Sequence, residues 1–230
     1  GRLPFTKGGE LAIPQFMSKS KPPFRLLYDN DTTNVIRAAL PEGRSGEGFD
    51  PAAFESAIEL TDAAIESSLD ETANSGVDVH KLSPGHSWVA WWKSKSAPAE
   101  EHYRWFEQTY GKSPDAYGRY MLAGGDMVAV FVRHCRKIGQ APFLSFRLNQ
   151  VQAIKGSARQ LNWTRWMEEH YPDHSLNEPS TPAKQQRRLN WALPEVRQHF
   201  LTFADELCSY DIDGFELDFT RHTSLFRLDQ

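Results

Sequence analysis

The sequence has few of the residues and motifs that identify a cofactor, a nucleic acid or a membrane as a partner. It contains 2 cysteines in 230 residues and no CxxC, HExxH, Walker loop or GxGxxG sequence, which indicates neither a disulfide framework nor a cofactor-binding loop. Lysine and arginine number 26 against 30 acidic residues and form no basic stripe, so nucleic acid is not expected as a partner. No apolar run reaches the length of about 18 residues that a membrane helix needs.

The first 23 residues are expected to be an N-terminal extension, because their glycines and prolines follow no periodic pattern. They contain no apolar stretch of the signal-peptide kind, and the chain starts with glycine rather than methionine. Localisation therefore stays open: we expect a soluble protein, secreted or periplasmic if an upstream signal peptide was removed. Cys135 and Cys208 fall within predicted helices, where each is expected to be a buried free thiol.

Alternating strand and helix patterns fill the rest of the chain. Asp50 and Pro51 supply an N-cap and a first-turn proline for a helix of about 20 residues. A second helix carries an apolar stripe from Val128 to Cys135, and a third opens at Pro194. Strands are predicted at residues 24–28, 77–82, 143–148 and 214–219. This alternation is typical of parallel βαβ units.

Long loops after the predicted strands and short turns before them favour a (β/α)8 TIM-type barrel, whose active-site loops follow the carboxyl ends of its strands. A doubly wound open sheet fits the order of elements equally well, although its phosphate-binding glycines are missing. Four strands cannot close an eight-stranded barrel. We therefore expect residues 24–230 to be the N-terminal half of a barrel catalytic domain, with the remainder supplied by a longer chain or by another chain.

Ionisable residues alternate with apolar ones along these strands, so one face of each strand carries charge. In the fourth strand Glu216 and Asp218 share a row, and in the third Arg147 and Asn149 do. Asp218 stands at the carboxyl end, where barrel enzymes place reacting groups. Arg147 and Glu216 have a second interpretation as an interior ion pair.

Polar residues also mark the ends of the first two strands. In the second strand Asp78 and His80 are expected to form the inward row, with His80 at the strand end. Asp29 and Asp31 crowd the end of the first strand. Together with Arg147 and Asn149, these strand-end residues are candidate substrate-binding groups.

Residues 213–222, with the sequence DGFELDFTRH, resemble the fourth-strand motif of glycosyl-hydrolase-like barrel proteins, a group with many uncharacterised bacterial members. The segment is also distantly similar to the alpha-amylase motif, in which the aspartate that matches Asp218 is the nucleophile, although Glu216 stands where those enzymes carry arginine. The resemblance implies a cofactor-free glycoside hydrolase that acts on an oligo- or polysaccharide.

Asp218 and Glu216 are the candidate catalytic carboxylates within the motif. Glycoside hydrolysis needs two carboxyl groups on opposite sides of the scissile bond. Glu216 lies on the same wall as Asp218, so the second group is expected on a later strand. Arg221 and His222, just past the strand, could keep the carboxylate ionised or bind an anionic group of the substrate.

Tryptophans follow two of the strands. Trp88, Trp91 and Trp92 lie within five positions after the second strand, and flat indole faces suit sugar rings, so we expect a substrate platform there. Packing of the loop onto the barrel is the alternative. The same hypothesis applies more weakly to the tryptophans after the third strand, which are Trp163, Trp166 and Trp191.

Two other functions fit the same residues. A metal-dependent hydrolase could gather an oxygen-rich site with one imidazole. Its ligands would be Asp29, Asp31, His80 and Asp218. A catalytically inactive barrel could instead serve as a carbohydrate-binding module.

Overall fold

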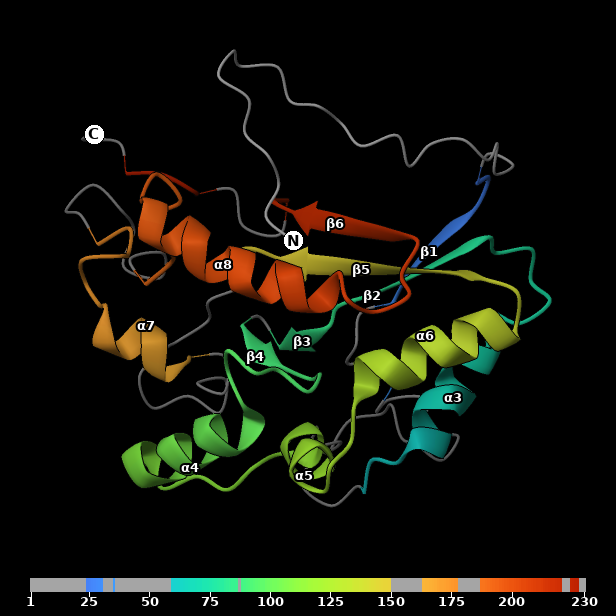
Figure 1. Cartoon of the computed structure of the whole chain (residues 1–230), viewed down its shortest axis with the longest axis horizontal. Helices are drawn as coiled ribbons and strands as arrows, with labels where there is room; N and C mark the ends of the chain where they lie inside the picture. The colour runs from blue at the N-terminus through green and yellow to red at the C-terminus, as the bar shows by residue number, and fades with distance from the viewer. Residues whose placement is uncertain are drawn as a thin grey trace, which may run out of the picture.

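The computed structural model describes residues 24–30, 35, 59–86, 88–149, 163–177, 187–220 and 224–227. The described residues contain a four-stranded parallel sheet, which confirms the α/β class (Figure 1). All four predicted strands are present, with boundaries shifted by a few residues. In spatial order they are β1 (Leu27–Asn30), β2 (Val79–Leu82), β5 (Ala141–Arg147) and β6 (Gly214–Asp218). The predicted extension at residues 1–23 lies outside the described residues.

Helices lie together on one side of this sheet. In Figure 1 the helices α3 to α7 all lie below the four strands. The predicted helices are α3 (Asp62–Asp70), α6 (Met127–Lys137) and α8 (Pro194–Leu207). Among the described residues, three helices and a hairpin were not predicted: α4 (Ala99–Tyr110), α5 (Ala116–Leu122), α7 (Arg165–Glu169) and the hairpin of β3 (Gly85–His86) with β4 (Val89–Ala90). None of the described helices is long and apolar enough to cross a membrane.

The start of α3 corrects the prediction of one helix of about 20 residues from Asp50. Residues 59–61 are not helical, and the Thr61 hydroxyl accepts a hydrogen bond from the backbone N–H of Ala64 at 3.2 Å. A threonine cap of this kind satisfies an N–H that has no partner within the helix, so it fixes a helix start. The preceding residues 31–34 and 36–58 lie outside the described residues.

Caps also explain the other two predicted helices. Asp126 accepts from the N–H of Ala129 at the start of α6, and Pro194 occupies the first turn of α8. Gly139, with φ of 77°, follows α6 in the left-handed conformation that glycine adopts without strain. The prediction for Cys208 was wrong, because α8 ends at Leu207 and Cys208 is an exposed C-cap, whereas Cys135 is buried as expected.

The strand register divides the side chains between two faces of the sheet. Paired residues of parallel strands point to the same side, and the register pairs Leu82 with Leu144 and Leu144 with Phe215. We call this side the helix-covered face. The opposite side, which we call the charged face, carries Asp29, Lys81, Arg147, Glu216 and Asp218.

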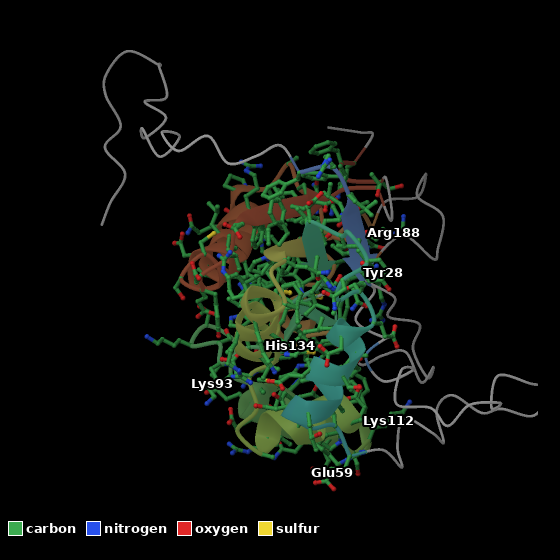
Figure 2. The ribbon with its side chains drawn as sticks, turned by 90° about the vertical axis from the view of Figure 1, so that its right-hand side faces the viewer. Tyr28, Glu59, Lys93, Lys112, His134 and Arg188 are labelled. Carbon is green, nitrogen blue, oxygen red and sulfur yellow. The ribbon has the colours of Figure 1, made fainter. Side chains whose placement is uncertain are left out.

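Aromatic rings join the helix-covered face to the helices. The Phe146 ring lies 5.3 Å from Phe200 and 6.3 Å from Phe203 of α8, between ring centroids. Helices α3 and α6 pack together, and the His134 Nε2 atom lies 2.7 Å from Asp70 Oδ1 at their contact. Figure 2 shows the molecule from the right-hand side of Figure 1, with His134 labelled between α3 and α6 and Tyr28 labelled at β1.

His80 lies on the helix-covered face and not on the charged face, which corrects the predicted inward row of the second strand. Its registered neighbours are Tyr28 and Pro142, and its ring packs 5.6 Å from Phe131 of α6. The strand continues to Leu82, so His80 does not end it. A one-residue difference in register reverses the face of every side chain in a strand. In β2 the register turns His80 toward the helices and Lys81 toward the charged face.

The His80 ring is held by buried polar side chains. Its Nε2 atom lies 3.1 Å from Asn30 Nδ2, and its Nδ1 atom lies 3.2 Å from Gln140 Oε1. Gln140 donates its amide N–H to Thr72 O, which directs its oxygen toward the ring and assigns Nδ1 as the donor. Burial lowers the pKa of His80 to about 4, against the opposing effect of the Gln140 hydrogen bond. The imidazole is therefore neutral at pH 7.

Acidification to about pH 5 is expected to lower the free energy of unfolding by about 2 kcal/mol through His80 alone. The folded-state pKa of about 4 lies below the ordinary value of 6.5, so the unfolded chain binds the proton first as the pH falls. The contribution of His80 to stability is therefore fully present above pH 6.5 and is lost as the pH falls from 6.5 to about 4. Urea unfolding followed by circular dichroism at about pH 7.5 and about pH 5 measures the loss.

The His80→Gln variant is the control, since its amide forms hydrogen bonds but does not titrate. It is expected to be less stable than the wild type near neutral pH, and its further loss on acidification should be smaller by about 2 kcal/mol. Equal losses in the two proteins would contradict a neutral, buried imidazole.

Candidate functional site

The charged face is organised by ion pairs that cross between strands. Lys81 of β2 reaches over β5, and its Nζ atom lies 2.6 Å from Glu216 Oε2 of β6. The same Nζ lies 3.6 Å from Asp29 Oδ2 of β1. Ser145, which is paired with Glu216 in the register, is buried and small. One cation thus links the two outer strands of the described sheet.

The acidic neighbours of Lys81 determine its protonation. Burial by itself would lower the pKa of Lys81, but the hydrogen bond and charge of Glu216, together with Asp29, raise the pKa above its ordinary value. Its side chain is 15% exposed, whereas that of Glu216 is 40% exposed. A charge this far removed from water is stable only when it is paired, so Lys81 remains a cation.

Asp218 lies at the carboxyl end of β6, as predicted, and both of its oxygens have partners. Its Oδ1 accepts hydrogen bonds from the Thr220 N–H at 2.8 Å and from the Thr220 hydroxyl at 2.7 Å. Its Oδ2 lies 3.8 Å from Arg147 Nε on the neighbouring strand. Donors and a cation both favour the charged form of a carboxyl group. The Asp218 side chain is therefore an oriented carboxylate, 15% exposed.

The pairing of acids with cations differs from the predicted ion pair between Arg147 and Glu216. The register sets Arg147 beside Asp218 and Ser145 beside Glu216. Arg147 is therefore two residues too far along its strand to face Glu216, whose partner is Lys81. Lys81 was not among the predicted site residues, because its sequence neighbour His80 was assigned to the charged face.

Asn149 stays close to the predicted strand end but is used in packing. It is 2% exposed, its Oδ1 accepts from Trp191 Nε1 at 2.9 Å, and its Nδ2 donates to Ser224 O at 2.5 Å. These contacts fix the segment after β6 to the end of β5. Asp78 also has a structural role, since its Oδ2 accepts hydrogen bonds from the backbone N–H groups of Arg25 and Leu26. These hydrogen bonds lower the pKa of Asp78.

The tryptophans expected to form a sugar platform are buried. Trp88, Trp91 and Trp92 are each at most 2% exposed. Trp91 stacks on Tyr117 at 3.8 Å, and Trp92 donates to Glu206 Oε2 at 2.9 Å. None of the three offers a flat face to solvent, and their loop packs against the helices. Of the later tryptophans, Trp163 and Trp191 are also buried, and Trp166 is partly exposed.

Three predicted binding residues cannot be placed. Asp31, Arg221 and His222 lie outside the described residues. For the alternative metal site, the structure separates the proposed ligands, since His80 is on the helix-covered face while Asp29 and Asp218 are on the charged face. Within the described ranges, no three histidine, cysteine or acidic side chains form a group that could hold a metal ion.

Sequence reasoning also missed a cavity on the helical side of the sheet. Its polar wall includes His102 and His199, with Trp166 beside them. A signal was available, because Ala99, His102, Tyr103 and Phe106 recur at the spacing of one helix face after Pro98. No helix was predicted in this segment.

Comparison with known proteins adds no identification: no protein family matches the chain, and no curated protein matches it significantly.

The pair Lys81–Glu216 is expected to contribute about 1 kcal/mol of coupling energy in a double-mutant cycle with Lys81→Met and Glu216→Gln. The reason is that the Lys81 side chain is largely screened from solvent. Urea unfolding of the wild type, both single variants and the double variant measures the coupling.

The pair Arg165–Glu169 is the matched control, because it is a well-formed ion pair whose side chains are 66% and 53% exposed. Its coupling is expected to be about 0.3–0.5 kcal/mol, as for other exposed pairs on a helix. A Lys81–Glu216 coupling no larger than the control would mean that the cross-strand pair does not organise the charged face.

Proposed function

We propose that this chain forms the first half of a (β/α)8 barrel and that the protein is a glycoside hydrolase in which Asp218 is a catalytic carboxylate. The observation that carries the proposal is the position of Asp218: it ends a parallel strand, on the sheet face opposite the helices, with both oxygens held. Carboxylates at the carboxyl ends of strands carry out the chemistry in barrel enzymes. The substrate class is an oligo- or polysaccharide, and the reaction needs no cofactor.

The sheet supports a barrel over a doubly wound fold. Its strands follow chain order without reversal, from β1 through β2 and β5 to β6, whereas a doubly wound sheet reverses its order at a switch point. The ring contacts of α6 and α8 fall on one face of the sheet. A closed barrel has helices only on its outer face, so its inner face corresponds to the charged face here.

The outer strands of the described sheet support continuation of the barrel. Leu26 and Leu27 at β1 are 49% and 50% exposed, and Leu217 and Phe219 at β6 are 45% and 40% exposed. Apolar side chains on two open strand edges favour association with further strands. We propose that later βα units cover both edges.

The chemistry assigned to Asp218 follows from its partners. An ionised carboxylate acts as the nucleophile in a retaining mechanism or as the base in an inverting one, whereas the proton donor must be a separate, protonated carboxyl group. Glu216 is unsuited to be that donor, since it is bound to Lys81 and lies two residues before Asp218 on the same strand. We therefore propose that the donor comes from a strand after β6.

Asp218→Asn in the full-length protein is expected to lower kcat on an aryl glycoside substrate by at least about a thousandfold. An amide has the shape of the carboxylate but cannot attack the anomeric carbon or activate water. Binding of the matching oligosaccharide, measured by calorimetry, should persist. Release of the aryl group, measured by absorbance across a panel of glycosides, identifies the substrate and gives the rate.

Thr220→Val is the matched control for geometry, because it removes the hydroxyl donor to Asp218 and keeps the carboxylate. It should retain activity at a reduced level. A fully active Asp218→Asn protein would exclude the proposed role of Asp218. A folded wild-type protein that binds oligosaccharide but cleaves none of the panel would favour the carbohydrate-binding module instead.

A further inference from the structure

A cavity of about 150 Å³ lies between α4, α7, α8 and the strand β4. Its lining is mostly apolar and includes Ala90, Ala97 and Phe203. Trp166 of α7 also lines the cavity and is partly exposed, whereas Trp88 and Phe203 in the same lining are buried. The Trp166 side chain therefore lies between the cavity and solvent, which is the position of a lid.

Ring stacking holds the Trp166 indole in this position. Among the described residues its N–H donates no hydrogen bond, whereas the indole N–H groups of Trp88 and Trp92 have acceptors. His199 of α8 stacks on the Trp166 ring, with 4.0 Å between centroids and 11° between planes. His170, at the end of α7, stacks on it at 4.5 Å and 26°. The indole is thus held by imidazoles and not by a hydrogen bond of its own.

His174 is a third imidazole beside the indole. Its ring lies 5.6 Å from Trp166 and 4.7 Å from His170, between centroids. Its Nδ1 atom is buried and has no hydrogen-bond partner among the described residues. Protonation makes both nitrogens of an imidazole donors and gives neighbouring rings like charges. Both changes disfavour the closed arrangement of these rings.

The stacked imidazoles resist protonation while the indole covers them. Burial, and to a lesser degree the nearby His170, lower the pKa of His199 to about 4. Burial and then His170 also lower the pKa of His174, against the smaller opposing effects of Glu195 and Asp173. The attraction of a protonated imidazole for an indole face is smaller than the cost of burying its charge. His199 is therefore neutral at pH 7.

The other charged groups around the lid leave this balance in place. Glu101 of α4 lines the cavity but is exposed to solvent, which screens its charge. Arg165 of α7 binds Glu169 Oε1 at 2.7 Å. His102 of α4 is neutral at pH 7, because burial lowers its pKa to about 4. In the part of the chain that the structure describes, no acidic side chain forms an ion pair with His199.

We propose that Trp166 is a lid on this cavity that is closed near neutral pH and opens on acidification, with His170, His174 and His199 as the groups that sense the pH. Opening turns the indole away from these rings and gives them access to water. Because the open form binds protons that the closed form excludes, closure is fully favoured above pH 6.5 and is lost as the pH falls from 6.5 toward about 4. The inference does not depend on the reaction assigned to Asp218, which is on the other face of the sheet.

The test is fluorine NMR of the full-length protein labelled with fluorotryptophan, in which Trp166→Phe assigns the Trp166 signal. A neutral gadolinium chelate in the solvent broadens the signal of each exposed indole. Between about pH 7.5 and about pH 5 the ratio of open to closed lid should rise by up to about thirtyfold, the factor reached when His199 regains its ordinary pKa on opening. The Trp166 signal should broaden at the lower pH, while that of the buried Trp92 should not change.

Substitutions of histidine separate the lid from general acid sensitivity. His199→Phe keeps a ring beside Trp166 but does not titrate, so its Trp166 signal should respond to pH much less than that of the wild type. His80→Gln is the matched control, because it removes an imidazole with the same low pKa that packs against Phe131 of α6. It should keep the full response. If His199→Phe is poorly folded, His174→Gln takes its place and should also reduce the response.

The outcomes are distinct. A Trp166 response that is present in the wild type and in His80→Gln and weakened in His199→Phe or His174→Gln supports the lid. The inference is overturned if Trp166 is equally exposed at the two pH values or if the histidine substitutions at the lid leave the response unchanged. It is also overturned if Trp92 becomes exposed together with Trp166, since acid would then unfold the helical layer instead of opening a lid.

Discussion

The cross-strand pairing of charges on one face of the sheet is the constraint on which the arrangement of the catalytic candidates depends. Lys81 ties Glu216 of β6 to Asp29 of β1, and Arg147 faces Asp218. Partly buried charges need partners at close range, so the strand register cannot slip without leaving acids and cations unpaired. The same register that satisfies these charges brings Asp218 to the carboxyl edge in an ionised, oriented state.

On the helical side of the sheet, three of the imidazoles are neutral at pH 7. His80 is held by Asn30 and Gln140 beneath the helices, and burial gives it a pKa of about 4. His102 and His199 share that low pKa within the helical layer. Neutral imidazoles can pack among aromatic rings without a counter-ion.

The two sides of the sheet are joined at the end of β5. Trp88 packs on Phe146, donates to Leu148 O at 3.2 Å, and also lines the cavity. One residue further on, Asn149 binds Trp191 and Ser224. The strand that supplies Arg147 to Asp218 is thus anchored by the aromatic layer on the other side of the sheet.

The sequence by itself determined the four strands of the sheet and the helices α3, α6 and α8 between them, because strand and helix periods, N-caps and turn residues are local properties. It located all four strands and the position of Asp218 at the end of β6. It could not determine which face His80 occupies, since Val79, His80, Lys81 and Leu82 alternate imperfectly and a shift of one residue exchanges the faces. Only the tertiary structure decided that Lys81 joins the charged face, that Asp218 and not Glu216 meets Arg147, and that Trp88, Trp91 and Trp92 are core. Each of these depends on contacts between residues far apart in the chain.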